Sequence, residues 1–562
     1  MTDGRIALFG MPCWDAQKPF HALALAGGIA RGARVPFSLH DLNIEFFHHV
    51  EQNERNLWNE SSNHLWFTPA MPSALWEKYE PWITARLDEA LAGEVKLAAF
   101  SVNMSTRYFS MRAARYLKSR RPDIPVMFGG VDCFPREHGK RFLESGSPCD
   151  IICQGEAEIA FTRYLEELSR TGDWRPTTPG FAYRDGDRIV DTGPAPLPDL
   201  QEKQPLPVYE AFDLSKYTAP GQLPFYLSRG CVYHCKFCSE GPNFIRYRRR
   251  RAEEAFEELI AILPLAQRHA AIPSLSFADS IINADIKTLR TFAELIIQHG
   301  IKIQWAGQGH FHPKMTYEFL ATLKEAGFVS FFWGFESGSQ NVVNLMNKRY
   351  SQTVARRIID DCVQLGISQH LPVLIGYPGE TAADVVDTIE FILRYRGKPR
   401  CHVHLPCQVI VRPNSPLFDD PGSFGLENAR DGYGWKLRDN SNTLPIRIAR
   451  RFVARQAHGN ADLSYAGLVD TEEIKNISLD ELGAARDLFT LIGEVFSRAG
   501  QADALPRRLG AAAGAQAAWL EKDKNSAQGR VWLYTLILDA LRALRDTVRL
   551  SPLPAGSGAN DA

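Results

Sequence analysis

Residues 231–238 read Cys-Val-Tyr-His-Cys-Lys-Phe-Cys (CVYHCKFC), so that three of the ten cysteines of a 562-residue chain fall within eight positions. The spacing is C-x3-C-x2-C, with Cys231, Cys235 and Cys238 as its members. Zinc sites usually take four ligands from two cysteine or histidine pairs, whereas here only His234 lies close to the three thiols. Three thiolates suit a 4Fe–4S cluster whose fourth iron stays open to a cofactor, because thiolates are the usual iron–sulfur ligands.

The composition indicates a chain of several domains without a dominant charge. At roughly 100–200 residues per domain, this length predicts about three domains. The 64 lysines and arginines nearly balance the 65 aspartates and glutamates, which speaks against nucleic acid or an anionic membrane as a partner. The N-terminus carries only a four-residue apolar run, and no stretch is long and apolar enough for a membrane span. We therefore expect a soluble, cytoplasmic protein, in which clustered cysteines hold a metal rather than form disulfides.

The first part of the sequence, residues 1–176, alternates strands with amphipathic helices. The clearest strand candidates are RIALFGMP (5–12), VKLAAFSVN (95–103) and IPVMFGG (124–130). Such alternation predicts a Rossmann-like α/β domain with a parallel sheet and helices on both faces. Ligands of such sheets bind beyond the carboxyl ends of the strands.

Residues 177–220 are rich in Pro, Asp and Gly, which predicts a linker lying over a surface. Strand and helix alternation then resumes over residues 221–430 with six strand candidates. This pattern predicts a partial (β/α)6 barrel whose site lies at the carboxyl ends of the strands. The cysteine loop would directly follow the first barrel strand. Residues 431–562 read as a mainly helical domain.

The cysteine spacing, the preceding strand PFYLSRG (224–230) and Phe237 before the last cysteine together resemble the radical S-adenosylmethionine (SAM) superfamily. The resemblance implies that Cys231, Cys235 and Cys238 bind a 4Fe–4S cluster. It also implies that the open iron chelates SAM, which an electron from the cluster cleaves to a 5′-deoxyadenosyl radical.

Further motifs follow later strands in the order that this family shows. SFADS (276–280) matches the place where the family contacts the amino group of SAM, with Ser276 and Asp279 as candidates. Glu336 and Ser337 match a polar position near the ribose or carboxylate of SAM, and LIGYPGET (374–381) matches the motif at the adenine end.

The first domain resembles the cobalamin-binding domain found upstream of many radical SAM barrels. In that family the corrin lies over the carboxyl edge of the sheet. The residues that match the loops at this edge are Ser101, Asn103, Gly129, Gly130, Gly155 and Glu156. The histidine motif D-x-H-x-x-G of other cobalamin domains does not occur, and His21 has the wrong spacing from Asp15. We therefore do not expect His21 to ligate cobalt, and cobalamin binding itself stays open.

The two resemblances together imply a cobalamin-dependent radical SAM methyltransferase. In that family one SAM methylates cobalamin, and the radical made from a second SAM activates an unactivated carbon, which then takes the methyl group. The substrate would be a natural product or a peptide, and an electron donor such as flavodoxin or ferredoxin would be needed. Glu336 and His310 are candidates for catalytic proton transfer.

Three other functions stay open at this point. The same cofactor pair also performs cyclisation or rearrangement in this family. A methylthiotransferase would need a second cluster held by three cysteines of the N-terminal domain, which Cys13, Cys133, Cys149 and Cys153 do not match in spacing. A corrinoid sensor without turnover would have no use for an open iron site.

Overall fold

The computed structural model describes residues 4–134, 139–240, 244, 246–404, 406–412, 414–429, 435–439, 441–443, 446–447 and 450–451, and four single residues beyond them, 454, 458, 491 and 494. The chain forms two compact units, which are Met1–Gly230 with Asn243–Ala306, and Cys231–Pro242 with Gly307–Ala562. The helical domain expected for residues 431–562 falls almost entirely outside the described residues.

A seven-stranded sheet forms the centre of the first part of the chain, with strand order β2-β1-β3-β4-β5-β6-β7. The first five strands are parallel, and β6 and β7 are antiparallel to their neighbours. The strands are β1 (Arg5–Gly10), β2 (Phe37–Asp41), β3 (Val95–Ser101), β4 (Val126–Gly129), β5 (Ile151–Cys153), β6 (Phe181–Asp185) and β7 (Arg188–Asp191).

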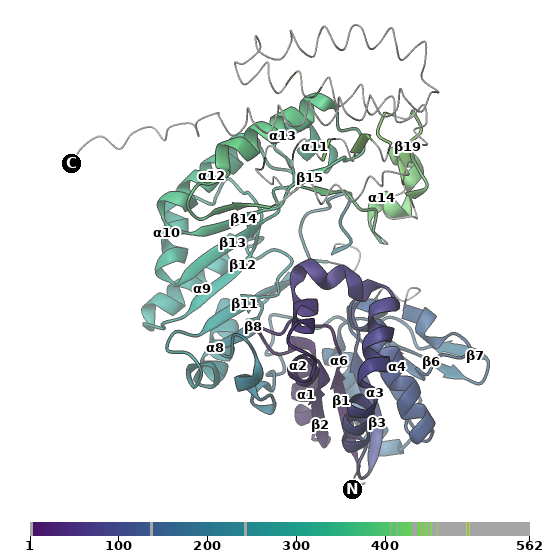
Figure 1. Cartoon of the computed structure of the whole chain (residues 1–562). Helices are drawn as coiled ribbons and strands as arrows, with labels where there is room; N and C mark the ends of the chain where they lie inside the picture. Colours follow the sequence, from purple (N-terminus) through teal and green to yellow (C-terminus); the bar gives the residue numbers. More distant parts are fainter. Residues whose placement is uncertain are drawn as a thin grey trace, which may run out of the picture. The chain divides into compact units, whose positions relative to one another are not determined.

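Helices cover both faces of this sheet, as the strand and helix alternation predicts (Figure 1). Helix α1 (His21–Gly32) contacts α6 (Ala157–Thr171), and α3 (Ala70–Ala90) contacts α4 (Arg107–Arg120). Helix α6 is amphipathic and buries Phe161, Leu165 and Leu168 along one stripe. The burial of this stripe against the sheet positions the start of α6 at the sheet's carboxyl edge.

The segment 177–220, whose composition predicts a linker, contributes β6 and β7 to the sheet. The two strands are joined by a tight turn in which Gly186 has a φ of +59°. The two turn residues are Gly186 and Asp187, and glycine suits the first turn position because it adopts a positive φ without strain. The later part of the segment also packs closely on α1 within the first unit: a Cβ on Gly28 would lie 2.2 Å from the carbonyl oxygen of Leu206.

A second, six-stranded sheet has the order β16-β14-β13-β12-β11-β8, and the unit boundary falls within β12. The pairs β8–β11, β11–β12, β13–β14 and β14–β16 are parallel, so the predicted partial β/α barrel is confirmed. Its strands are β8 (Gln222–Phe225), β11 (Ser274–Phe277), β12 (Gln304–Gly309), β13 (Phe328–Trp333), β14 (Ser368–Leu371) and β16 (Cys401–Val403).

Helices follow the strands of this sheet along one side (Figure 1). In the first unit these are α8 (Ala252–Gln267) and α9 (Ile286–Gln298). In the second unit they are α10 (Tyr317–Glu325), α11 (Gln340–Leu345), α12 (Gln352–Gln364) and α13 (Ala382–Tyr395). Each strand therefore has one helix-covered face and one face turned away from the helices.

Residues before and after β16 together form an apolar cluster in the second unit. Short strands β15 (Leu374–Ile375) and β17 (Cys407–Gln408) pair in parallel, and β18 (Leu426–Glu427) pairs with β19 (Lys436–Leu437). The cluster includes Tyr377, Leu417 and Trp435, and Phe237 of the cysteine loop packs against it. Within the described part of the chain, no helix has the length and apolar character needed to cross a lipid bilayer.

Candidate functional site

The cysteine loop, residues 231–238, is held in the second unit by hydrogen bonds from both sides. The backbone N–H of Lys236 donates to the carbonyl of Met346 at 3.1 Å, and the Lys236 carbonyl accepts from the N–H of Leu417 at 3.0 Å. The side-chain amide of Asn347 donates to the carbonyl of His234 at 2.8 Å. The loop is therefore fixed by groups that are distant in the sequence.

The three thiols of the loop are free and half-buried. The backbone N–H of Tyr233 lies 3.4 Å from Cys231 Sγ, and that of Glu240 lies 3.5 Å from Cys238 Sγ. Such N–H groups stabilise negative charge on sulfur and are one means of tuning iron–sulfur clusters. No three His, Cys, Asp or Glu side chains of the described residues converge closely enough for a single metal ion. In a 4Fe–4S cluster each thiolate binds a different iron, so its ligands need no such convergence.

The electrostatics of the loop also fit metal binding better than nucleophilic chemistry. Burial raises the pKa of Cys231 and Cys235, and it raises that of Cys238 to about 11. A reactive cysteine requires a lowered thiol pKa, whereas a bound metal deprotonates its thiol ligands directly. The donor set and its surroundings therefore suit a cluster with three thiolate ligands.

An ion pair between Lys348 and Glu336 lies next to this loop. The Lys348 ammonium is 3.0 Å from Glu336 Oε1, and their side chains are 5% and 13% exposed. The ammonium also lies 5.6 Å from the ring centre of Phe237. A Cβ on Gly334 would lie 2.7 Å from Lys348 Nζ, so glycine leaves the space that the ammonium occupies.

Glu336 has a left-handed backbone, with a φ of +68°. Its N–H donates to the Pro372 carbonyl at 3.0 Å, and its carbonyl accepts from the Leu374 N–H at 2.7 Å. A non-glycine residue held in this conformation by two hydrogen bonds is typical of functional positions. The predicted candidate Glu336 therefore lies beside the cysteine loop in the second unit.

Ser337, which sequence reasoning placed with Glu336, is turned into the protein. Its hydroxyl lies 3.0 Å from the Thr388 hydroxyl and accepts from the N–H of Ser339. The residue is fully buried. These contacts favour a structural role for Ser337 rather than contact with a cofactor.

His310 contacts the cysteine loop through Tyr233. Its ring stacks on Tyr233 with centres 3.7 Å apart, and Nε2 lies 2.6 Å from the carbonyl of Lys348. Burial, assisted by the Lys348 ammonium, lowers the pKa of His310 to about 3. A neutral imidazole that donates to a carbonyl is suited to positioning the loop rather than to proton transfer.

In the first unit, Asp279 follows β11 and holds the end of β8. Its carboxylate accepts from the Leu227 N–H at 3.0 Å and from the Ser228 hydroxyl at 2.6 Å. Burial raises its pKa to about 7, although these hydrogen bonds act in the opposite direction. Asp279 therefore fixes the segment that leads to Gly230 and the cysteine loop. Ser276 lies half-buried in β11.

A cavity of about 330 Å³ lies in the first unit, at the carboxyl edge of the seven-stranded sheet and between α1 and α6. Its walls are mainly apolar, and small residues line much of it. The apolar residues of the lining include Leu8, Leu23, Ala26, Ala99, Met127 and Phe161.

Five of the six residues predicted for this edge line the cavity. They are Ser101, Gly129, Gly130, Gly155 and Glu156. Gly130 has a φ of +105°, and a Cβ there would lie 2.6 Å from the carbonyl oxygen of Val102. Asn103 does not belong to the lining, because its side-chain oxygen accepts from the backbone N–H groups of Ser105 and Thr106 and caps a turn.

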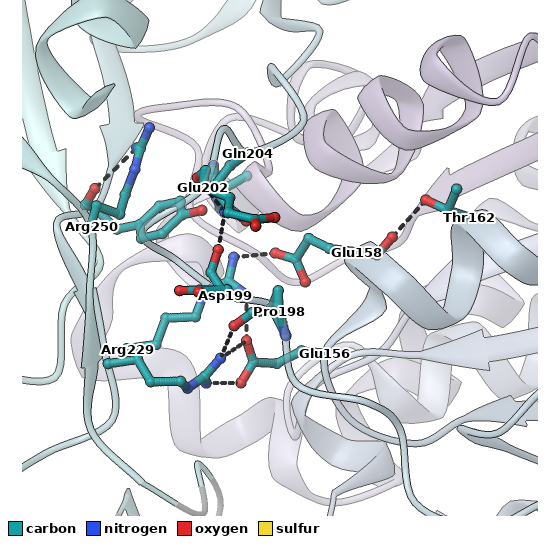
Figure 2. Close-up of polar contacts among 12 residues, drawn as sticks. Glu156, Glu158, Thr162, Pro198, Asp199, Glu202, Gln204, Arg229 and Arg250 are labelled. Atoms are coloured by element: carbon teal, nitrogen blue, oxygen red, sulfur yellow. Dashed lines mark hydrogen bonds and ion pairs between the residues drawn. The ribbon is translucent and has the colours of Figure 1, made fainter. Parts of the chain in front are cut away.

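A buried charge network includes Glu156, Glu158 and Arg229 of the cavity lining. Figure 2 shows polar contacts of this network. Arg229 bonds to Glu156 at 2.6 Å and forms a short ion pair with Glu158, and Arg248 also pairs with Glu156. The Arg229 guanidinium lies over the ring of Tyr226, 4.7 Å from its centre. Sequence reasoning did not single out Arg229, although its place directly before Gly230 and the cysteine loop was a usable signal.

His21, at the start of α1, also lines the cavity and has one defined tautomer. The Tyr209 hydroxyl donates to the Pro224 carbonyl at 2.7 Å, since a carbonyl cannot donate. His21 Nδ1, 2.7 Å from the same hydroxyl, must then be the donor of that hydrogen bond. The proton is therefore on Nδ1, and the buried Nε2 carries a lone pair without a hydrogen-bond partner among the described residues. Burial lowers the His21 pKa to about 4.

Comparisons with known proteins agree with this arrangement. Residues 225–392 match the model of the Radical SAM superfamily. An uncharacterized methyltransferase from Pyrococcus horikoshii is 25% identical over 304 residues, which are 52% of this chain and 63% of that protein. An anaerobic magnesium-protoporphyrin IX monomethyl ester cyclase from Synechocystis sp. is 25% identical over 274 residues, 47% of this chain and 52% of that protein. The chain thus spans between half and two thirds of the length of these relatives.

A solved structure has a similar fold. It is the cobalamin-dependent S-adenosylmethionine radical enzyme OxsB with aqua-cobalamin bound, with a TM-score of 0.62 and 14% identity. The alignment covers 97% of this chain and 80% of that one. The predicted combination of an α/β domain with a partial barrel is therefore confirmed as a fold.

Proposed function

We propose that this chain is a cobalamin-dependent methyltransferase acting on an unactivated carbon of a natural product or peptide. The proposal starts from its identification as a radical SAM enzyme. The radical SAM domain implies a 4Fe–4S cluster and SAM, and Cys231, Cys235 and Cys238 are the residues that would hold the cluster. When bound, the cluster and SAM supply a 5′-deoxyadenosyl radical, and cobalamin carries the methyl group.

The observation that carries the cobalamin part of the proposal is the cavity at the carboxyl edge of the seven-stranded sheet. Ligand pockets are mostly apolar spaces of about 300–1,000 Å³ with a few polar groups, and this cavity of about 330 Å³ fits the lower end of that range. Gly129, Gly130 and Gly155 allow a large ring system to approach the backbone closely. The cavity would take part of the corrinoid, with His21 and Arg229 as polar groups in its wall.

The side chains near the cysteine loop would prepare the site rather than perform the hard chemistry, which the cofactors supply. The Lys348–Glu336 pair places a fixed positive and negative charge beside the loop in a partly dry environment. His310 and Asp279 would hold the loop and the strand before it. Glu336 is the side chain most suited to contact SAM, because its strained backbone holds it at the carboxyl end of β13.

Metal analysis tests the proposal. The full chain is purified anaerobically from cells supplied with cobalamin, and cobalt and iron are measured per chain. We expect about one cobalt and about four irons, with iron lost and cobalt retained in the Cys231→Ala, Cys235→Ala, Cys238→Ala variant. Four irons without cobalt would exclude a cobalamin-dependent reaction and leave a simpler radical SAM enzyme.

A second candidate is cyclisation or rearrangement with the same cofactors. The similarity to the Synechocystis cyclase favours it as the alternative. SAM with a trideuterated methyl group separates the two functions. A product that gains three deuterium atoms indicates methyl transfer. A product that has the same number of methyl groups as the substrate, and that forms together with 5′-deoxyadenosine, indicates cyclisation or rearrangement.

A methylthiotransferase is disfavoured by the cysteines of the first unit. Cys133, Cys149 and Cys153 are buried, whereas the three cysteines of the loop are half-buried. Cys149 Sγ lies 3.0 Å from the Ile151 carbonyl, inside the sheet. These thiols act as small core residues, as expected for free cysteine.

A reductant such as flavodoxin or ferredoxin remains the proposed partner.

A further inference from the structure

The cavity at the carboxyl edge of the seven-stranded sheet has a polar end formed by His21 and Tyr226. Both residues line the cavity, and all the lining residues belong to the first unit. The two rings meet edge to face with centres 5.6 Å apart. The buried Nε2 atom of His21 and the buried hydroxyl of Tyr226 have no hydrogen-bond partner among the described residues. We call these two groups the polar pair.

The polar pair offers one hydrogen-bond acceptor and one donor. The contacts of Tyr209 place the His21 proton on Nδ1, and burial keeps the ring neutral by lowering its pKa to about 4, so Nε2 can only accept. Burial raises the pKa of Tyr226 to about 12, so its hydroxyl keeps the proton and can donate. A ligand that satisfies both groups must therefore carry a donor for His21 and an acceptor for Tyr226.

The two unpaired groups are an exception that a ligand would explain. Buried polar groups in proteins are nearly always hydrogen-bonded, because desolvation without a partner is unfavourable. Tyr226 is only 4% exposed, and the apolar residues of the lining cannot pair with its hydroxyl. Two such groups at one end of a mainly apolar cavity therefore indicate a binding site for a ligand with a defined polar group.

The charges of the lining exclude an anion as that polar group. Among the described residues that line the cavity, only Arg229 carries a guanidinium or ammonium group. Arg229 already pairs with Glu156 and Glu158 (Figure 2). A ligand carboxylate would thus find no uncompensated cation, would meet the carboxylate of Glu158 in the same lining, and could not donate to His21. Burying an unpaired anion is costly, so the ligand group should be neutral.

Among neutral groups, the primary carboxamide matches the polar pair best. Its NH2 group donates and its carbonyl oxygen accepts, and these atoms lie side by side in one plane. A ketone or an ester offers only the acceptor. A hydroxyl would have to serve both members of the polar pair through one oxygen, whereas the amide gives each of them its own hydrogen bond.

We propose that the polar pair binds a primary carboxamide, whose N–H donates to His21 Nε2 and whose carbonyl oxygen accepts from the Tyr226 hydroxyl. This inference deepens the proposed function and rests on it, because carboxamides surround the ring of a corrinoid. The cavity would thus select an amidated corrinoid against one with free carboxylates. A peptide offers the same group in asparagine and glutamine, and the experiment separates the two sources.

Three ligands of nearly the same shape test the proposal. 2-Naphthamide carries the carboxamide, 2-acetylnaphthalene has a methyl group in place of the NH2 group, and 2-naphthoate has a charged oxygen there. Each is titrated by saturation-transfer NMR against the full chain, purified anaerobically from cells grown without cobalamin. Cobinamide, which carries the corrin carboxamides but no nucleotide, is then added as a competitor.

The variants are Tyr226→Phe and His21→Ala, with two matched controls in the same unit. These are Tyr116→Phe, whose hydroxyl bonds to Asp88 on the surface, and His269→Ala, an exposed histidine. Tyr226→Phe should not lower the thermal midpoint of the chain without ligand, because its hydroxyl has no partner to lose. Weaker binding by this variant would then report the contact with the ligand and not a loss of folding.

We expect the amide to bind about tenfold more tightly than the ketone, and the acid to bind more weakly still. Tyr226→Phe should weaken both the amide and the ketone about tenfold, because both carry the carbonyl. His21→Ala should weaken the amide alone, and the two controls should change neither. Equal binding of the amide and the ketone, preferred binding of the acid, unchanged amide binding in both variants, or no binding of the amide would each overturn the proposal.

Competition identifies the source of the carboxamide. Displacement of the amide by cobinamide supports the corrinoid, whereas amide binding that cobinamide leaves unchanged would overturn the assignment to a corrinoid in favour of a peptide. The readout needs neither cobalt nor turnover. Amide recognition in a chain that takes up no cobalamin would therefore refute the proposed function alone, and cobalamin uptake without an amide preference would overturn this inference alone.

Discussion

The ammonium of Lys348 and the carboxylate of Glu336 lie 3.0 Å apart in a nearly solvent-free position beside the cysteine loop. Burial by itself disfavours the charged amine, but Glu336 and the neighbouring thiol of Cys235 keep the pKa of Lys348 above its ordinary value. The charged form of Lys348 is thus favoured, with Glu336 as its partner in the ion pair. The position of this pair links the strand end at Glu336 to the loop that would hold the cluster.

We expect Lys348→Met to lower the free energy of unfolding by about 3–5 kcal/mol, because a buried carboxylate would lose its partner. Glu336→Gln should have an effect of the same sign. In the double variant much of the loss should be recovered, since no unpaired charge remains. Urea denaturation of the four proteins measures the coupling, and strictly additive losses would contradict a mutual ion pair.

Asp279 should make stability depend on pH in a predictable direction. Its folded-state pKa of about 7 lies above the ordinary value of 3.8 because the carboxyl is buried. The folded state therefore holds this proton more tightly than the unfolded state, so the stabilising contribution is complete below about pH 4. It is lost as the pH rises from about 4 to 7.

In the variant Asp279→Asn the side chain cannot ionise, so the protein should not lose this stabilising contribution as the pH rises from about 4 to 7. Relative to the wild type, it should gain stability between pH 4 and pH 7, by about 1.4 kcal/mol for each unit of pKa shift. Denaturation midpoints of both proteins at several pH values measure the difference. A difference that does not change with pH would show that Asp279 is ionised at its ordinary pKa.

His310 should matter for the cysteine loop rather than for proton transfer. Its removal in His310→Ala takes away the ring that stacks on Tyr233 and the hydrogen bond to the Lys348 carbonyl. We expect iron retention after reconstitution to fall to about half or less, because a net hydrogen bond of about 1 kcal/mol and a ring contact are lost. His312→Ala, on the same segment, should retain iron fully. Full iron content with abolished turnover in His310→Ala would instead support a catalytic role.

The elements that the sequence alone could predict are those with local signals. The cysteine spacing needs only eight residues, and the alternation of apolar runs and amphipathic helices identified all six barrel strands. The hairpin of β6 and β7 is not predicted, because the proline-rich residues around it obscure the Gly-Asp turn at Gly186 and Asp187. The composition of a long segment does not reveal a turn of two residues.

The polar partners could not be predicted, because they join residues far apart in the sequence. Arg229 pairs with Glu158, and the His370–His404 bond spans 34 positions. Asn103 shows the opposite error: its place after β3 is right for a ligand contact, but its side chain caps a turn. Strand ends can be read from a sequence, whereas the direction of a side chain depends on tertiary neighbours.

The spacing of His21 from Asp15 speaks against a role as a cobalt ligand, but the geometry around His21 indicates another contact with a ligand. Its Nδ1–H is fixed by Tyr209, and its unprotonated Nε2 lies in the wall of the cavity. A buried acceptor without a partner is costly, so a ligand that donates a hydrogen bond there would gain affinity. Amide N–H and ribose O–H groups of a corrinoid are such donors.

We therefore expect His21→Ala to weaken cobalamin binding about tenfold, which corresponds to a hydrogen bond of about 1.4 kcal/mol. Tyr209→Phe should have a smaller effect of the same sign, because Nδ1 would lose the partner that fixes the tautomer. His269→Ala, an exposed histidine of the same unit, serves as the control. Equilibrium dialysis of the anaerobic full chain against cobalamin measures all three, and parallel dialysis against cobinamide, which lacks the nucleotide, locates the contact. A tenfold loss with cobalamin alone assigns His21 to the nucleotide, an equal loss with both assigns it to the corrin, and unchanged affinity for both would remove His21 from the binding site.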